Sequence, residues 1–265
     1  MGLGHIPSSI PKGEDTIMAS RFDVTKEKLA KVEDKYSHLS KRTKAHTVYT
    51  DRKGKMVLSV TTILKLLPKF ALIPWAYNLG LVRQDYNKVR QEAADIGTVV
   101  HDLINSREDA GVNNYLNDMD YHIGDRARWS FENYKKFKKD HDLKILKQEL
   151  TLTFGGDRNT PAFGGTCDMV AEVDGKLSLV DFKTGNAVYK ESVLQRAAYD
   201  MLLGLEGIKV EQYCLVRVPS KEPDTYEITI YQPQDNYKTT FILLAKACYA
   251  LEESIGLSLH AKGSS

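Results

Sequence analysis

The sequence predicts an α/β (α+β) protein with a mixed central sheet flanked by helices and a helical N-terminal subdomain. Three observations lead to this prediction. Helical periodicity dominates the chain up to about residue 140. Three consecutive strand patterns follow, separated by turn residues. After them the patterns run helix, strand, strand, helix to about residue 255, which is typical of a sheet covered by helices.

The N-terminal region divides into an arm and a mostly helical subdomain. Residues 1–20 are rich in Gly, Pro and Ser, which predicts a flexible arm. Within the subdomain at 21–140, two β-prone runs flank a turn and predict a hairpin near 46–59. Ser59 is expected to cap a short helix that ends before Pro68. Further helices are predicted over 72–82, 85–108 and 122–140.

The core is predicted to cover residues 141–258. Asp174-Gly175 separates its second and third strands and is a pair favoured in two-residue type I′ turns. Residues 259–265 are expected to form a flexible tail. The expected elements are strands at 146–154, 163–173 and 176–183, a helix over 190–205, strands near 211–218 and 225–231, and a final helix over 236–255.

Composition limits the class of protein more than it identifies a partner. A net charge of +2 neither indicates nor excludes nucleic-acid binding. The three cysteines are too few and too scattered for a disulfide framework or a paired metal site. No apolar run approaches the roughly 20 residues that span a bilayer, and the N-terminus lacks a secretory pattern. We therefore expect an intracellular, soluble protein, with the cytoplasm, a host cell's cytoplasm and the mitochondrial matrix left open.

Two aspartates face each other in the predicted hairpin. The register that pairs Val173 with Lys176 also pairs Asp168 with Asp181, with Cβ atoms about 4.5–5.5 Å apart. Lys183 projects from the same face. Opposed carboxylates destabilise a sheet unless a cation offsets them, and Mg²⁺ and Mn²⁺ prefer carboxylate oxygens. The alternative is an exposed Asp pair with Lys183 in a surface ion pair.

Asp168, followed by Asp181-Phe182-Lys183-Thr184-Gly185, resembles the signature of PD-(D/E)XK nucleases in its RecB-like exonuclease form. Three further segments resemble motifs of that branch in the expected order: Gly97 with His101, Glu149, and Gln195 with Tyr199. The resemblance covers about 40% of the chain. It implies a restriction-endonuclease-like core.

The resemblance also implies roles for these residues. Hydrolysis of a phosphodiester by a metal-activated water would use Mg²⁺ or Mn²⁺, as one or two ions. The implied catalytic residues are Asp168, Asp181, Lys183 and Glu149, with Lys183 in an electrostatic role. The implied metal ligands are His101, Asp168, Asp181 and the backbone carbonyl of Phe182. Some relatives hold an iron–sulfur cluster with four cysteines, and with three cysteines we expect none here.

Substrate contacts are expected from three places. Gln195 and Tyr199 share one helix face, and the resemblance implies that they support the site or touch the DNA backbone. The alternative for Tyr199 is a core position beside Leu202 and Leu203. The basic and aromatic stretch at 126–139, which includes Arg126 and Arg128, has the composition of a single-strand groove. The alternative for this stretch is an amphipathic helix with its aromatics in the core. A second patch includes Trp75 beside threonines and lysines at 61–69.

These observations favour a Mg²⁺- or Mn²⁺-dependent DNA exonuclease that prefers single strands or free ends and serves DNA repair, recombination or replication. A structure-specific or sequence-specific endonuclease on the same core stays open, because the covering helices set the preference for ends. A nucleic-acid-binding module without catalysis also stays open, although every expected acidic and basic position is filled.

Overall fold

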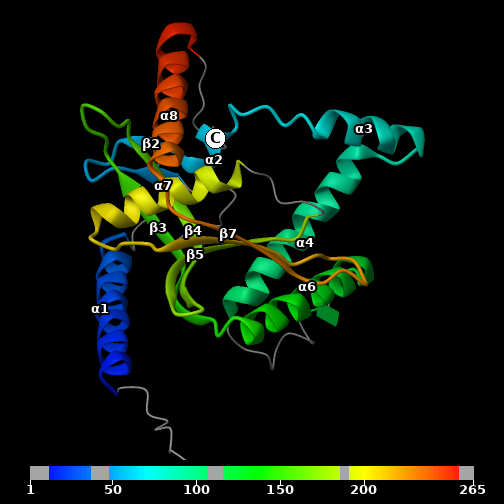
Figure 1. The fold of residues 1–265 in the computed structure, drawn as a ribbon. Coiled ribbons are helices and arrows are strands. Elements are labelled where there is room, and N and C mark those ends of the chain that lie inside the picture. Colours follow the sequence, from blue (N-terminus) through cyan, green and yellow to red (C-terminus); the bar gives the residue numbers. More distant parts are fainter. Residues whose placement is uncertain (1–11, 37–47, 107–115, 118, 186–190, 257–265) are drawn as a thin grey trace, which may run out of the picture.

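The computed structural model describes residues 12–36, 48–106, 116–117, 119–185 and 191–256 (Figure 1). The helices are α1 (Lys12–Tyr36), α2 (Val60–Leu64), α3 (Leu72–Leu81), α4 (Tyr86–Ser106), α6 (Tyr121–Asp140), α7 (Ser192–Leu205) and α8 (Asp235–Ile255). The strands are β1 (Tyr49–Thr50), β2 (Met56–Ser59), β3 (Lys144–Phe154), β4 (Phe163–Val173), β5 (Lys176–Lys183), β6 (Gln212–Arg217) and β7 (Glu227–Tyr231). The predicted fold class is confirmed.

Seven strands form one mixed sheet in the order β1-β2-β4-β5-β6-β7, with β3 paired to β4. β2 runs parallel to β4 and β5 runs parallel to β6, whereas the other neighbours are antiparallel. β4 pairs with β2 at 163–164 and with β5 at 169–173. Residues 165–168 lie between these two pairings, and Asp168 is among them. Asp168 therefore lies in the stretch of β4 where its pairing passes from β2 to β5.

Helices cover both faces of the sheet (Figure 1). On one face lies the α7 core, which includes Cys167, Val170, Leu179, Leu202 and Phe241. On the other face lies the α4 core, which includes Val100, Phe137, Met169, Val180 and Phe182. Because both faces are covered, β6 is buried at every residue instead of alternating between buried and exposed positions.

The hairpin of β4 and β5 forms as the sequence predicts. Val173 pairs with Lys176 and Met169 with Val180. Asp174 and Gly175 have φ angles of +50° and +77°, as both central residues of a type I′ turn require. The residues predicted for the apolar face, namely Met169, Ala171, Val173, Val180 and Phe182, all lie in the α4 core. The predicted register is confirmed, and it places Asp168 one step beyond the last pair of this ladder.

The N-terminal half differs from its expected organisation. Residues 1–11 of the predicted arm and residues 257–265 at the C-terminus lie outside the described residues, but 12–20 form the start of α1. The predicted hairpin corresponds to β1 and β2, and β2 joins the core sheet beside β4. The boundary expected near residue 140 therefore does not separate two sheets. Among the described helices, none is long and apolar enough to cross a membrane.

Helix α6 resolves the two alternatives left open for residues 126–139. Phe131, Tyr134 and Phe137 are buried at 5%, 4% and 0% exposure and belong to the α4 core. Their rings pack against one another and against Phe182. The structure favours the second alternative, an amphipathic helix whose aromatic face packs into the core, so these three rings are not available to stack on bases.

Candidate active site

Helix α4 brings His101 close to the strands that carry the predicted aspartates. Gly97 lies one turn earlier, and a Cβ atom on it would stand 3.5 Å from Thr184 Oγ1. The helix therefore passes so close to Thr184, the residue that follows Lys183, that an alanine in place of Gly97 would reach van der Waals contact with it. His101 Nδ1 lies 3.9 Å from Asp168 Oδ2, and its imidazole is partly exposed. Residues four apart on a helix share a face, so Gly97 and His101 both face the strands.

Glu149 has a backbone conformation that is rare within a strand. Its φ of +50° lies in a region that residues other than glycine seldom occupy. Gln148 and Glu149 both contact Asn105 of α4, although successive strand residues normally point to opposite faces. Asn105 Nδ2 donates a hydrogen bond to Glu149 Oε1 at 2.6 Å. The positive φ thus goes with a carboxylate turned toward α4.

Asp168 lies at a point where the alternation of side chains along β4 is interrupted. Cys167 belongs to the α7 core and Met169 to the α4 core, although residues two apart in a regular strand share a face. Asp168 Oδ2 accepts a hydrogen bond from the Phe182 backbone N–H at 3.4 Å. Burial raises the pKa of the Cys167 thiol to about 12. The thiol next to Asp168 is therefore neutral at physiological pH in the metal-free protein.

His101, Glu149 and Asp168 form a compact group. Each offers one ligand atom, and these atoms lie within 4.8 Å of one another. The three residues come from α4, β3 and β4, and all three are partly exposed. An imidazole and two carboxylates are a donor set that suits a divalent cation of the first transition row.

The carboxylate of Asp181 is buried and held by two cations. Arg196 Nη2 of α7 lies 2.5 Å from Asp181 Oδ1, and Lys183 Nζ lies 2.7 Å from Oδ2. The Arg196 side chain is 1% exposed, so this ion pair is withdrawn from water. The approach of Lys183 lacks the angles of a hydrogen bond. Asp181 Oδ2 is therefore buried without a hydrogen-bond partner among the described residues.

These contacts divide the predicted ligands into two neighbouring groups. Asp168 lies with His101 and Glu149, whereas Asp181 lies with Lys183 and Arg196. The hydrogen bond from the backbone that follows Asp181 to the Asp168 carboxylate joins the two groups. A single ion shared by both aspartates stays a prediction.

Gln195 and Tyr199 lie on one face of α7, as their spacing predicts. Gln195 Nε2 donates a hydrogen bond to the Tyr199 hydroxyl at 3.3 Å. A Cβ atom at Gly165 of β4 would stand 2.6 Å from Tyr199 Cε1, so the ring can pack against β4 only because Gly165 has no side chain. Burial raises the pKa of Tyr199 well above its ordinary value. The hydroxyl therefore stays protonated and serves as a hydrogen-bonding group rather than a base.

A family model described as the PD-(D/E)XK nuclease superfamily matches residues 74–246, well over half of the chain. The chain belongs to the PD-(D/E)XK nuclease superfamily. No curated protein matches the sequence.

Three solved structures are similar to this chain at low sequence identity. A candidate exonuclease from Eubacterium rectale is 13% identical, with 76% of this chain and 82% of that chain covered and a TM-score of 0.47. A chain named SSO0001 is 15% identical, with 87% and 88% covered and a TM-score of 0.37. LHK-Exo in complex with dAMP is 14% identical, with 63% and 97% covered and a TM-score of 0.36. The family assignment rests on the sequence match and not on these likenesses.

PD-(D/E)XK nucleases use divalent metal ions, and the residues of this chain fit such an ion. The donor set of His101, Glu149 and Asp168 supplies nitrogen and oxygen ligands at close range. The Oδ2 atom of Asp181 is buried without a hydrogen-bond partner among the described residues, and the Lys183 ammonium is the cation beside it. An oxygen that accepts no hydrogen bond keeps its lone pairs free for a metal ion.

Two residues with roles at the site escaped the sequence reasoning. Arg196 stands inside the Gln-x-x-x-Tyr segment, where an arginine reads as a solvated helix charge, yet it pairs with Asp181. Asn105 lies four residues after His101 and so shares its helix face, which is the one signal that would have singled it out. Both hold a predicted site carboxylate in place.

The residues predicted to bind substrate from outside the core have other partners. Arg126 donates to Ser220 Oγ at 3.2 Å and Arg128 to Asn117 Oδ1 at 3.1 Å. Trp75 of α3 packs edge-on against Tyr86, with ring centroids 5.2 Å apart. Their contact with DNA stays a prediction.

Proposed function

We propose that the protein is a DNA exonuclease that depends on Mg²⁺ or Mn²⁺ and favours single strands or free ends. The observation that carries the proposal is the convergence of His101, Glu149 and Asp168 beside the Asp181–Lys183 pair. Membership of the PD-(D/E)XK nuclease superfamily supports phosphodiester hydrolysis as the reaction. The preference for free ends follows the resemblance to the RecB-like exonuclease branch, and the covering helices would set it.

The residues divide the chemical work between metal binding and charge stabilisation. His101, Glu149 and Asp168 would hold the ion, with Asp181 and the Phe182 carbonyl as further ligands. A bound divalent ion supplies an activated water and offsets the charge that develops on the phosphate.

Lys183 carries a partly exposed positive charge at the edge of the site. Its side chain is 36% exposed and still lies 2.7 Å from Asp181 Oδ2. An ammonium in this place donates hydrogen bonds to a phosphate oxygen and stabilises negative charge that builds up in the transition state. Asp181 orients the ammonium, and Arg196 anchors Asp181 from the buried side.

A degradation assay tests the proposal. The purified protein is incubated with end-labelled single-stranded and double-stranded DNA in Mg²⁺, in Mn²⁺ and with a chelator. We expect activity with either ion, a higher rate in Mn²⁺ because an imidazole is among the ligands, and none with the chelator. A covalently closed single-stranded circle should resist degradation, whereas cleavage of the circle would indicate an endonuclease.

Substitution of Lys183 tests the catalytic assignment. Lys183→Ala should lower kcat by about 10²–10³-fold, the usual effect of removing a group that stabilises developing charge. Lys176→Ala at the other end of the same strand is the matched control and should keep full activity. Equal degradation by the wild type and by Lys183→Ala would point to a contaminating nuclease and contradict the assignment.

A further inference from the structure

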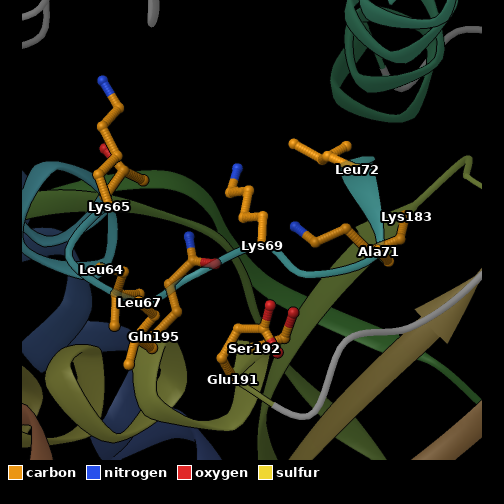
Figure 2. A pocket seen from close by; sticks show the side chains of 11 residues that line it. Leu64, Lys65, Leu67, Lys69, Ala71, Leu72, Lys183, Glu191, Ser192 and Gln195 are labelled. Carbon is orange, nitrogen blue, oxygen red and sulfur yellow. The ribbon is translucent and has the colours of Figure 1, made fainter. Parts of the chain in front are cut away.

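A cavity of about 330 Å³ opens beside the proposed active site. We call it the connector pocket, because the segment between α2 and α3 forms one of its walls and the start of α7 another. Lys183 and Gln195 are part of its lining, so it is continuous with the site (Figure 2). The full lining comprises Thr61, Leu64, Lys65, Leu67, Lys69, Ala71, Leu72, Lys183, Glu191, Ser192 and Gln195.

The connector pocket combines an apolar wall with positive charge. Leu64, Leu67 and Leu72 give it apolar surface. Figure 2 shows the amines of Lys65 and Lys69 extending to the same side of the pocket, while Lys183 extends from β5 toward Lys69. Lys65 and Lys69 are exposed, so their charges are available to a ligand. An apolar surface for a flat ring beside cations for phosphates matches a nucleotide within a strand.

The pocket offers few groups that could read the identity of a base. The Gln195 amide donates to the Tyr199 hydroxyl, and its Oε1 accepts from Arg196 Nη2 at 2.9 Å. The Thr61 hydroxyl lies 3.0 Å from the Ser59 hydroxyl. Recognition of a base requires free hydrogen-bonding groups at its edge. Glu191 and Ser192 are the remaining uncharged or acidic polar side chains of the lining. Apolar contact would therefore supply most of the hold on a base, with little dependence on its identity.

We propose that the connector pocket seats one unpaired nucleobase of the DNA end, while Lys65 and Lys69 contact the neighbouring phosphates. The inference rests on the proposed function and adds the substrate form that the site accepts. A cavity of this volume is at the lower limit of those that enclose one drug-sized ligand. It suits one nucleotide and is too small for a base pair with two backbones. An end must therefore be single-stranded or frayed before cleavage.

The test fills the pocket and compares substrates with and without a base. Ala71 is an exposed lining residue, so Ala71→Trp adds bulk without replacing a core side chain. Ala93→Trp, on the exposed surface of α4 and outside the lining, is the matched control. The substrates are single-stranded oligonucleotides with a normal or an abasic nucleotide at each end in turn, and bis(4-nitrophenyl) phosphate, which has no base.

We expect the wild type to show a KM at least about tenfold lower for one base-bearing end than for the same end made abasic. Ala71→Trp should abolish that difference while it still hydrolyses bis(4-nitrophenyl) phosphate in Mn²⁺. Ala93→Trp should behave as the wild type. Equal KM values for base-bearing and abasic ends in the wild type would overturn the inference. If the wild type hydrolyses neither the small diester nor DNA, the proposed function itself fails.

Removal of the two lysines tests the phosphate contacts separately. For Lys65→Ala with Lys69→Ala, the dependence of log KM on log salt should become shallower by about 1.4, since each contact to a single strand contributes about 0.7. Lys176→Ala should leave the slope unchanged. An unaltered slope in the double variant would overturn the part assigned to these lysines.

Discussion

The two ends of the β4–β5 hairpin differ in how regular their structure is. At the turn end the ladder is regular from Met169 to Val173, and Asp174 and Gly175 occupy the conformations that their types favour. At the site end the strands next to Asp168 depart from regularity. Glu149 has a positive φ, β4 changes face at Asp168, and Asp181 is a buried charge that depends on a distant arginine.

The difference shows that features which lower stability are concentrated at the site end of the hairpin. At the turn end, local preference and overall fold agree, which is the condition for a well-defined structure. At the site end, strain and buried charge persist because the surrounding helices determine them, and such features cluster at functional sites. Substitutions at the turn end should therefore change stability alone, whereas those at the site end should change activity or both.

The largest effect is expected from Arg196→Met. Removal of the guanidinium leaves the Asp181 carboxylate buried with Lys183 as its remaining cation among the described contacts. Loss of one partner of a buried pair costs about 3–5 kcal/mol in the free energy of unfolding. Denaturant unfolding monitored by circular dichroism measures this loss, and nuclease activity should fall with it.

A double variant separates lost pairing from lost packing. Adding Asp181→Asn to Arg196→Met removes the unpaired charge, so the double variant should regain much of the stability while it stays inactive. If the two losses in stability simply add, the ion pair does not couple the two residues and the comparison between the hairpin ends weakens.

A smaller effect is expected from Gly165→Ala, where β4 meets Tyr199. The new Cβ atom would stand 2.6 Å from Tyr199 Cε1, so the buried ring has to move. Overpacking of this kind costs about 1–3 kcal/mol, and the displaced tyrosine should lower kcat as well. Gly80→Ala on α3 is the control, because its Cβ would meet no atom within 4 Å. Equal thermal stability of the two variants would contradict the close packing at Gly165.

Asn105→Ala should affect catalysis more than folding. The amide that holds Glu149 Oε1 is lost, while the half-buried position tolerates the smaller side chain. Loss of a group that orients a metal ligand typically costs about 10–100-fold in metal affinity or activity. The Mn²⁺ concentration that gives half-maximal activity measures the effect. Ser106→Ala, next to it on α4, should leave this concentration unchanged. An equal change of this Mn²⁺ concentration in both variants would contradict the role of Asn105.

The smallest effect is expected at the turn end, from Gly175→Ala. The new Cβ atom would meet nothing within 4 Å, so the cost is the strain of an alanine at a φ of +77° alone. That strain amounts to about 1 kcal/mol of unfolding free energy. Activity per folded molecule should equal that of the wild type. A loss of activity larger than the loss of folded protein would show that the two ends are coupled.

The sequence by itself determined the helices and strands of the core, the register of the hairpin and its apolar face. These features depend on residues close in sequence, because a two-residue turn and the alternation of side chains leave little freedom. It also placed His101, Glu149, Asp168 and Asp181 in recognisable motifs.

Only the tertiary structure decided which of these side chains meet. In it, Asp181 pairs with Arg196 and Glu149 accepts a hydrogen bond from Asn105. The aromatics of α6 are buried, and β2 pairs with the core sheet. Each of these outcomes depends on segments that are distant in the chain, and local periodicity carries no information about which distant surface a side chain will meet. Which side chains are buried and which charges are paired depends on how the helices pack on the sheet.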